Sequence, residues 1–243
     1  MSTRVGTGAV LGVGSQRGFD WNRTDVVGKS HGPEAMVGLR IDNHPDLMEA
    51  SYRLRYQVYC VERGFLSATD YPDQLERDDF DRYSLHLGVV DRNGELKATS
   101  RLIQVSVLGL PMFRHCEIFP HETEVFRSTN RIAEVSRLCM SRQPGDRDRS
   151  EVIPTMYRAL YQFSKRAGFT HWLVATERGL HRLLTGFGFP FRPVGPQIDY
   201  FGPVAPYMMD FQEFDQIVLS GTRANLATFT EGLEPEFHPA ACV

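Results

Sequence analysis

The chain has 243 residues, enough for one α/β domain with terminal extensions. Hydrophobic residues make up 42% of it and charged residues 23%, which indicates a sizeable buried core and argues against general disorder. With 27 basic against 30 acidic residues, it lacks the basic excess typical of nucleic-acid-binding proteins, and no apolar run approaches the roughly 18 residues of a membrane span. We therefore expect no nucleic-acid partner and no stable membrane insertion.

Cysteine and histidine spacing points to neither a disulfide framework nor a metal site. The cysteines are widely separated and form no CxxC pair: Cys60, Cys116, Cys139 and Cys242. The histidines show neither HxxxH nor HExxH spacing, so no metal is expected. The first residues lack the long apolar stretch of a signal peptide, which makes the cytoplasm the expected compartment.

The periodic part of the sequence predicts one domain over residues 41–220. Residues 1–40 are rich in Gly, Ser and Arg without a sustained period, and we expect a flexible leader there. Residues 221–243 have a similar character and are expected to form a C-terminal tail.

The first predicted element is an amphipathic helix over residues 44–65. Apolar or small residues recur at steps of four and three and are expected to face the core: Leu47, Ser51, Leu54, Val58, Val61 and Phe65. A more polar line runs beside them, formed by Arg55, Tyr59 and Glu62, and Gly64 is placed to end the helix.

Strands and helices alternate through the rest of the domain. After an acidic, turn-rich segment (70–81), the pattern predicts a hairpin (85–90 and 96–105), a strand (132–140), a helix (152–167), a strand (171–176), a short helix (179–185) and then aromatic, Gly- and Pro-rich segments up to Tyr207. This order implies a mixed sheet covered by helices. No GxGxxG follows the first strand and no GxxxxGK[ST] occurs, which disfavours dinucleotide and P-loop sites.

Charged residues interrupt elements that are otherwise apolar. Arg101 lies in mid-strand, and Glu134-Val135-Ser136-Arg137 lies in the next strand. Charges in central strands cost free energy unless they are paired, so Arg101 and Arg137 are expected to pair with Asp78, Asp81 or Glu134 around one cleft. The residues alone leave open whether this cluster is catalytic or a structural salt-bridge cluster.

A basic loop precedes the helix predicted at residues 152–167. Arg142, Arg147 and Arg149 flank Pro144-Gly145-Asp146, and arginines beside the free amides of a helix start suit a phosphate group. A solvated charged loop is the alternative interpretation.

Eight segments across roughly residues 44–210 form a specific combination: Arg55-Tyr56-Gln57-Val58-Tyr59-Cys60, Glu62 to Leu66, Tyr71-Pro72-Asp73, Asp78-x-x-Asp81, Arg101-Leu102-Ile103, Glu134-Val135-Ser136-Arg137-Leu138, Leu183 to Phe189, and Gly195 to Tyr200. In this order they resemble the motifs of the exosortase-associated acyltransferases, close relatives of N-acyl amino acid synthases and more distant relatives of acyl-homoserine-lactone synthases.

The resemblance implies an α/β protein with the GCN5-related N-acyltransferase fold, a twisted mixed sheet with splayed central strands and helices on both faces. It implies an enzyme that moves a long-chain fatty acyl group from acyl carrier protein, or from acyl-coenzyme A, to the amine of an amino acid or a similar small molecule, without a permanently bound cofactor. By position, the acceptor side would be built by Arg55, Asp78, Asp81, Arg101, Glu134 and Arg137, with Tyr59, Leu138 and Cys139 as further substrate-binding candidates.

The chain departs from the family pattern at the phosphate loop. Most members have Arg/Gln-x-x-Gly-x-Gly/Ala, whereas this chain has Arg142-Gln143-Pro144-Gly145-Asp146-Arg147, which favours an acidic carrier protein over coenzyme A. Two alternatives stay open: an acetyl-coenzyme A-dependent acetyltransferase, and a non-catalytic acyl-binding module of the same fold. Late aromatic residues such as Phe187, Phe189, Phe191, Tyr200, Phe201 and Tyr207 would line either pocket.

Acyl transfer requires an amine to attack a thioester carbonyl while the carrier thiolate leaves. Glu134 is expected to act as the base, and backbone amides from Ser136 to Cys139 are expected to hold the oxyanion. Arg101 or Arg137 would bind a carboxylate if the acceptor is an amino acid, because a guanidinium fork matches two oxygens.

Overall fold

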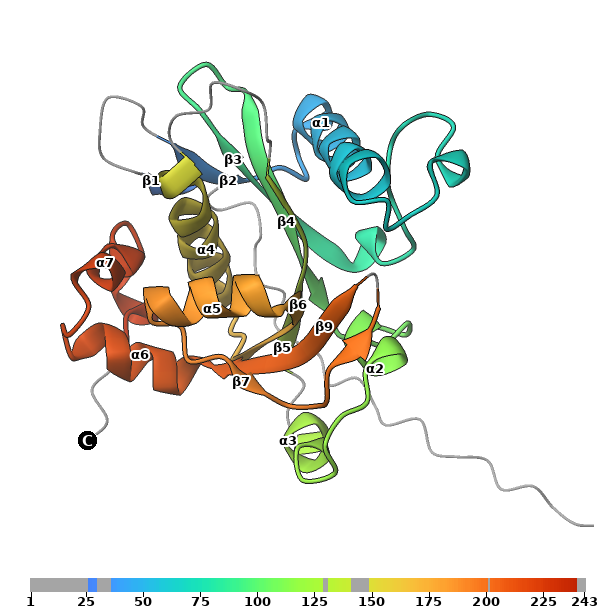
Figure 1. Cartoon of the computed structure of the whole chain (residues 1–243). Coiled ribbons are helices and arrows are strands. Elements are labelled where there is room, and N and C mark those ends of the chain that lie inside the picture. The colour runs from blue at the N-terminus through green and yellow to red at the C-terminus, as the bar shows by residue number, and fades with distance from the viewer. Residues whose placement is uncertain (1–25, 30–35, 129–130, 141–148, 201, 240–243) are drawn as a thin grey trace, which may run out of the picture.

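The fold is built on one mixed sheet, seen edge-on in the computed structural model, which describes residues 26–29, 36–128, 131–140, 149–200 and 202–239 (Figure 1). The strand order is β1-β2-β3-β4-β5-β6-β9-β7, with β8 paired to β9. The pair β5–β6 is parallel and the other pairs are antiparallel. The strands are β1 (Val26–Lys29), β2 (Val37–Arg40), β3 (Ser84–Val90), β4 (Leu96–Gln104), β5 (Ile132–Met140), β6 (His171–Glu177), β7 (Arg192–Pro193), β8 (Ile198–Asp199) and β9 (Pro203–Asp210).

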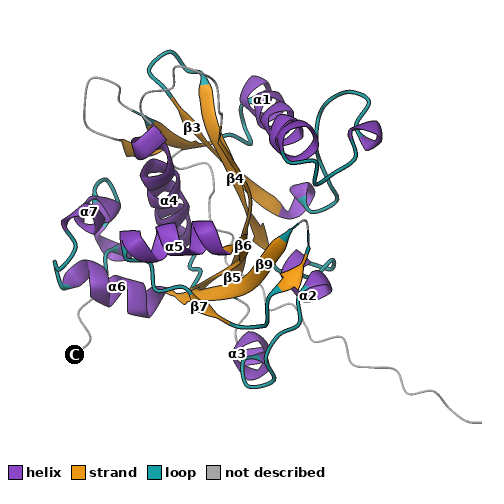
Figure 2. Cartoon of the chain, viewed as in Figure 1, coloured by secondary structure: helices purple, strands orange, loops and turns teal. Residues whose placement is uncertain are grey.

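Helices cover both faces of this sheet (Figure 2). One face carries α1 (Pro45–Tyr56), which continues into the π-helical segment η1 (Gln57–Glu62), together with α2 (Pro111–His115) and α3 (Thr123–Ser128). The other face carries α4 (Arg149–Arg166), α5 (Arg178–Phe187), α6 (Phe211–Leu219) and α7 (Ala224–Ala227). Short 3-10 turns complete the structure: η2 (Ala68–Asp70), η3 (Asp81–Tyr83), η4 (Thr228–Thr230) and η5 (Pro235–Phe237). The predicted α/β fold with helices on both faces is confirmed.

Apolar burial on the two faces is unequal. The larger core lies under α4 to α7, where Trp172, Phe189 and Phe214 pack against the sheet. A smaller core, which includes Ile103 and Leu173, lies under α2 and α3. On the face that carries α1, α2 and α3, the central strands between α1 and α2 are therefore covered by polar side chains, such as Arg101 and Glu134, and not by an apolar core.

The helix predicted over residues 44–65 exists, but the face assigned to the core is only partly right. Ser51 of that face is buried, whereas Val61 of the same face is 56% exposed and Arg55 of the polar line is buried. The chain widens into a π-helix from Gln57, which shifts the residues that follow around the helix axis. Burial of Arg55 is possible because carboxylates on the neighbouring segment bind its guanidinium group.

The ordered fold extends into both predicted tails. Strand β2, from the predicted leader, pairs with β3 and contributes the buried Leu39. In the predicted C-terminal tail, Leu226, Phe229 and Leu233 are buried in the larger core.

Candidate functional site

The site is formed where the two parallel strands at the centre of the sheet separate. β5 and β6 pair from Ile132 opposite His171 to Glu134 opposite Leu173, and no pairing is described beyond that point. A cavity of about 460 Å³ occupies the gap, lined on one side by Val135 to Met140 of β5 and on the other by Val174 to Glu177 of β6. The splayed central strands predicted from the sequence are therefore present.

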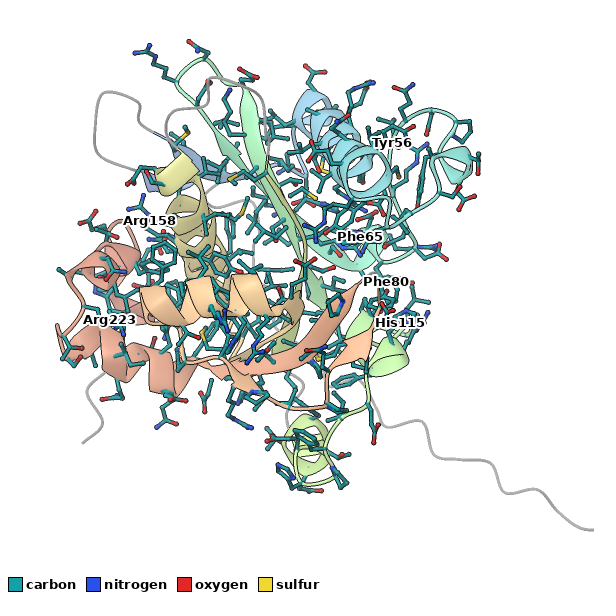
Figure 3. The ribbon with its side chains drawn as sticks, viewed as in Figure 1. Tyr56, Phe65, Phe80, His115, Arg158 and Arg223 are labelled. Atoms are coloured by element: carbon teal, nitrogen blue, oxygen red, sulfur yellow. The ribbon has the colours of Figure 1, made fainter. Side chains whose placement is uncertain are left out.

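The cavity is lined from both faces of the sheet, because alternate residues of the separated strands face opposite sides, and we call its two sides the apolar lobe and the polar lobe. The apolar lobe lies on the α4 side and is lined by Leu138, Met140, Ile153, Tyr157, Val174 and Leu180. The polar lobe lies on the α1 side and is lined by Tyr59, Arg63, Glu134, Ser136, Arg137 and Tyr200. Phe65, labelled in Figure 3 on the α1 side of the sheet, also lines this lobe.

A β-bulge in β5 directs Arg137 into the polar lobe. Thr99 of β4 lies opposite Cys139 and Arg101 lies opposite Ser136, so β5 has one residue more than β4 in this interval. Arg137 adopts a φ of 54°, a left-handed conformation that costs a residue with a Cβ about 1–3 kcal/mol. Without the extra residue, Arg137 would point to the α4 side like Val135.

Three arginines and three carboxylates form a closed ring of alternating charge on the α1 side. Each arginine binds two carboxylates and each carboxylate binds two arginines. In order, the ring runs Arg55, Glu76, Arg137, Asp78, Arg101, Asp81 and back to Arg55.

Distances within the charged ring are those of charge-assisted hydrogen bonds. Arg101 Nη1 lies 2.6 Å from both Asp78 Oδ1 and Asp81 Oδ1. Arg137 Nη2 lies 3.0 Å from Glu76 Oε1 and 3.2 Å from Asp78 Oδ2. The ring thus ties the segment before β3 to β4 and β5.

Burial alone would raise the pKa of the ring aspartates, but the arginines outweigh it. The pKa of Asp81 is held well below its ordinary value of 3.8 by Arg55 and Arg101, and that of Asp78 is lowered by its hydrogen bond to Arg101. Since the folded values lie below the unfolded ones, these carboxylates stabilise the fold at neutral pH. That contribution is lost only as the pH falls through the lowered values.

The sequence placed five of these ring residues together and missed the sixth. Glu76 is fully buried, yet it lies in an acidic, turn-rich segment in which nothing sets it apart from exposed neighbours such as Asp79. Glu134 was expected among the carboxylates that pair with these arginines. The structure has Glu76 in that role, and Glu134 lies outside the ring.

Glu134 stands apart from the charged ring, in the polar lobe at the last described residue pair of β5 and β6. Its Oε2 accepts a hydrogen bond of 2.9 Å from the amide of Met112 at the start of α2, and its side chain lines the cavity. Burial raises the pKa of this carboxyl to about 7, although the Met112 amide and the nearby arginines oppose the rise. A carboxyl with a pKa near neutrality can accept and release a proton at physiological pH.

The remaining substrate-side candidates line the same cavity. Tyr59 and Cys139 are linked by a hydrogen bond, and the guanidinium carbon of Arg137 lies 5.1 Å from the centre of the Tyr59 ring. Burial raises the pKa of Cys139 to about 12, so its thiol is not a nucleophile at neutral pH. Leu138 lies in the apolar lobe, and Ser136 lies in the polar lobe opposite Arg101.

An ion pair that the sequence did not indicate spans the open end of the gap. Arg63, which follows η1, binds Glu177 at the end of β6, and both side chains line the cavity. The guanidinium group of Arg63 also lies over the Phe65 ring, at 4.7 Å from its centre.

Several sequence-based candidates lie elsewhere. Arg142 and Arg147 are outside the described residues, and Arg149 is described only as the first residue of α4. Glu62 is exposed. Of the late aromatic residues, Tyr200 lines the cavity, while Phe189, Phe191 and Tyr207 pack in the larger core.

Two further properties hold for the part of the chain that the structure describes. It contains no group of three or more His, Cys, Asp or Glu side chains placed to hold a metal ion. None of its helices is both long enough and apolar enough to cross a membrane.

The charged ring predicts a large stability loss when one member is neutralised. In Glu76→Gln, Arg55 and Arg137 stay buried without their shared carboxylate, so the free energy of unfolding should fall by about 3–5 kcal/mol. The matched control is Glu49→Gln, in an exposed pair with Arg53, which should change it by less than about 1 kcal/mol. Urea unfolding at pH 7 measures both, and equal stabilities for the two variants would contradict the ring's structural role.

Known proteins that resemble this chain in sequence or fold are acyl-transferring synthases. The family model described as "N-acyl amino acid synthase FeeM" matches residues 50–206, and no curated protein matches the chain. Among solved structures, the chain is similar to TofI in a ternary complex with an inhibitor and MTA, with a TM-score of 0.60 and 18% identity over 83% of this chain and 98% of that one.

Two further structures show the same fold. The CoA-dependent acyl-homoserine lactone synthase BjaI, with SAM and isopentyl-CoA, gives a TM-score of 0.59 and 20% identity over 84% of this chain and 89% of that one. FeeM, an N-acyl amino acid synthase from uncultured soil microbes, gives a TM-score of 0.51 and 16% identity over 75% of this chain and 94% of that one. The GCN5-related acyltransferase fold and the family resemblance predicted from the sequence are thus confirmed. The family model matches more than half of this chain, which therefore belongs to the FeeM family of N-acyl amino acid synthases and is an acyltransferase.

Proposed function

We propose that this protein moves a long-chain fatty acyl group from acyl carrier protein to the amine of an amino acid or a similar small molecule, in the cytoplasm. The observation that carries the proposal is the cavity with one apolar and one polar side, with Glu134 at the point where β5 and β6 separate. An apolar lobe suits an acyl chain, and a polar lobe on the other side of the sheet suits the acceptor. A thioester placed where β5 and β6 separate would be reached from both sides.

The reaction needs one proton acceptor and one oxyanion site. Glu134 takes a proton from the acceptor ammonium, and the free amine attacks the thioester carbonyl. Backbone amides of β5 between Ser136 and Cys139 stabilise the tetrahedral oxyanion, since this stretch has no described pairing with β6. Collapse of the intermediate forms the amide bond and expels the carrier thiolate.

Arg137 is the arginine of the ring that suits an acceptor carboxylate. Arg101 is 1% exposed, and both of its terminal nitrogens bind ring carboxylates. Arg137 lines the polar lobe, and its Nη1 has no partner among the described residues. A carboxylate in this lobe would bind Nη1 with the geometry that a guanidinium group favours.

The proposed function predicts a new N-acyl amino acid when the protein is incubated with long-chain acyl carrier protein and a pool of amino acids. Mass spectrometry of the products identifies the acceptor. A parallel incubation with the same acyl group on coenzyme A, and with acetyl-coenzyme A, compares the donors. Faster transfer from coenzyme A would overturn the carrier-protein assignment, and acyl binding without any product would favour the acyl-binding module.

The Glu134 assignment predicts a pH dependence. A base must be deprotonated, so kcat should rise with pH through about 7 and level off above it. Glu134→Gln retains an acceptor for the Met112 amide but cannot take a proton, so kcat should fall about 100-fold or more. Steady-state kinetics from pH 5.5 to 9 measure both, with Glu95→Gln as the exposed control. Near-normal turnover by Glu134→Gln would contradict the base assignment.

The Arg137 assignment predicts selectivity for an acceptor that carries a carboxylate. The wild type should prefer an amino acid over its carboxamide, and Arg137→Gln should reduce that preference about 10–100-fold, mainly through KM for the acceptor. Comparing kcat/KM for the two acceptors measures the ratio, which a general loss of stability would leave unchanged. The assignment fails if Arg137→Gln keeps the wild-type ratio.

A further inference from the structure

The apolar lobe contains a hydroxyl group that the proposed reaction does not use. Tyr157 lies on α4, is 1% exposed and lines the cavity. Its ring packs against Phe189, at 5.1 Å between ring centres, and edge-on against Trp172, at 6.1 Å. Among the residues that the structure describes, the hydroxyl has no hydrogen-bond partner.

Two polar groups that pack near Tyr157 in the same core have protein partners, unlike the Tyr157 hydroxyl. One turn along α4, the hydroxyl of Tyr161 donates to Asp215 Oδ1 at 2.7 Å. The indole nitrogen of Trp172 donates to Ser164 Oγ at 2.8 Å. An unpaired hydroxyl in apolar surroundings costs free energy, and a phenylalanine would fill the same space without that cost. A partner supplied by a ligand in the cavity accounts for the hydroxyl.

Tyr157 lies at the deep end of the lobe. Its neighbour Trp172 pairs with Ala133, one residue before the last described pair of β5 and β6. Ile153, one turn earlier on α4, lies nearer to the open end of the cavity. The chain enters α4 from the end of β5 that no longer pairs with β6, so the first turns of α4 lie at that end. The Tyr157 ring therefore lies at the end of the apolar lobe nearer to the point where the strands part. If the thioester is placed at that point, the first carbons of the acyl chain are those nearest to Tyr157.

We propose that the Tyr157 hydroxyl binds an oxygen substituent, a hydroxyl or keto oxygen, on one of the first carbons of the acyl chain. The enzyme then selects oxygenated acyl donors over plain ones. This inference rests on the proposed function, in which the apolar lobe holds the acyl chain. A plain chain leaves the tyrosine hydroxyl unpaired, whereas an oxygenated chain satisfies both polar groups at once.

Binding of free fatty acids tests the inference without requiring acyl transfer. The probes are 3-hydroxyhexadecanoic acid and hexadecanoic acid, titrated into the full chain by calorimetry. The wild type should bind the hydroxy acid about 10-fold more tightly. Tyr157→Phe, which keeps the ring and its packing, should bind the two acids with equal affinity and hexadecanoic acid as tightly as the wild type does.

Tyr161→Phe is the matched control, because it removes a hydroxyl from the same helix outside the cavity and should keep the wild-type preference. The inference is overturned if the wild type binds both acids equally or binds neither. It is also overturned if Tyr157→Phe weakens both equally, since the hydroxyl would then contact a group common to both. A preference lost in Tyr157→Phe, in a protein that transfers no acyl group, would reject the proposed function and still establish the contact between Tyr157 and the oxygen of the chain.

Discussion

The ring of alternating charge is the interaction on which the polar side of this site depends. Each of its arginines is held by two carboxylates, so Arg55 and Arg101 stay buried, and Arg137 largely so, with no net charge around the ring. A buried charge without its partner is strongly destabilising, and the ring residues therefore depend on one another. Because they come from α1, the segment before β3, β4 and β5, the ring also fixes the wall of the polar lobe.

Glu134 differs from the ring carboxylates because it lies outside the ring. A carboxyl bound by two arginines, as in Asp81, has a lowered pKa and cannot take up a proton near neutrality. Glu134 is more deeply buried and has one amide hydrogen bond, and burial raises its pKa to about 7. Carboxyl groups on the same face of one sheet thus have opposite properties, set by their burial and by the arginines beside them.

The sequence predicts the regular elements well because their signals are local. Periodicity located β5 and the body of α4, and the cost of charges in central strands brought Arg101 and Arg137 together with the aspartates. The family resemblance supplied the splayed strands. Features that depend on tertiary contacts were not predictable: the burial of Glu76, the positive φ of Arg137 in a strand without glycine, and the two lobes of the cavity.

The short pairing of β5 and β6 divides the sheet into two antiparallel halves that meet along a seam. On one side of it, β1 to β5 form a continuous antiparallel ladder, and on the other, β6 pairs with β9 over its whole length. Across the seam the backbone contributes only the pairs from Ile132 to Glu134, and the Arg63–Glu177 ion pair lies at its open end. A sheet opens locally where the fewest backbone hydrogen bonds join its strands. Backbone amides within each half should therefore exchange slowly with solvent, and amides along the seam should exchange first. An acyl chain lying in the cavity would contact both halves of the sheet. Substrate binding would therefore reduce opening along the seam and make the sheet more rigid.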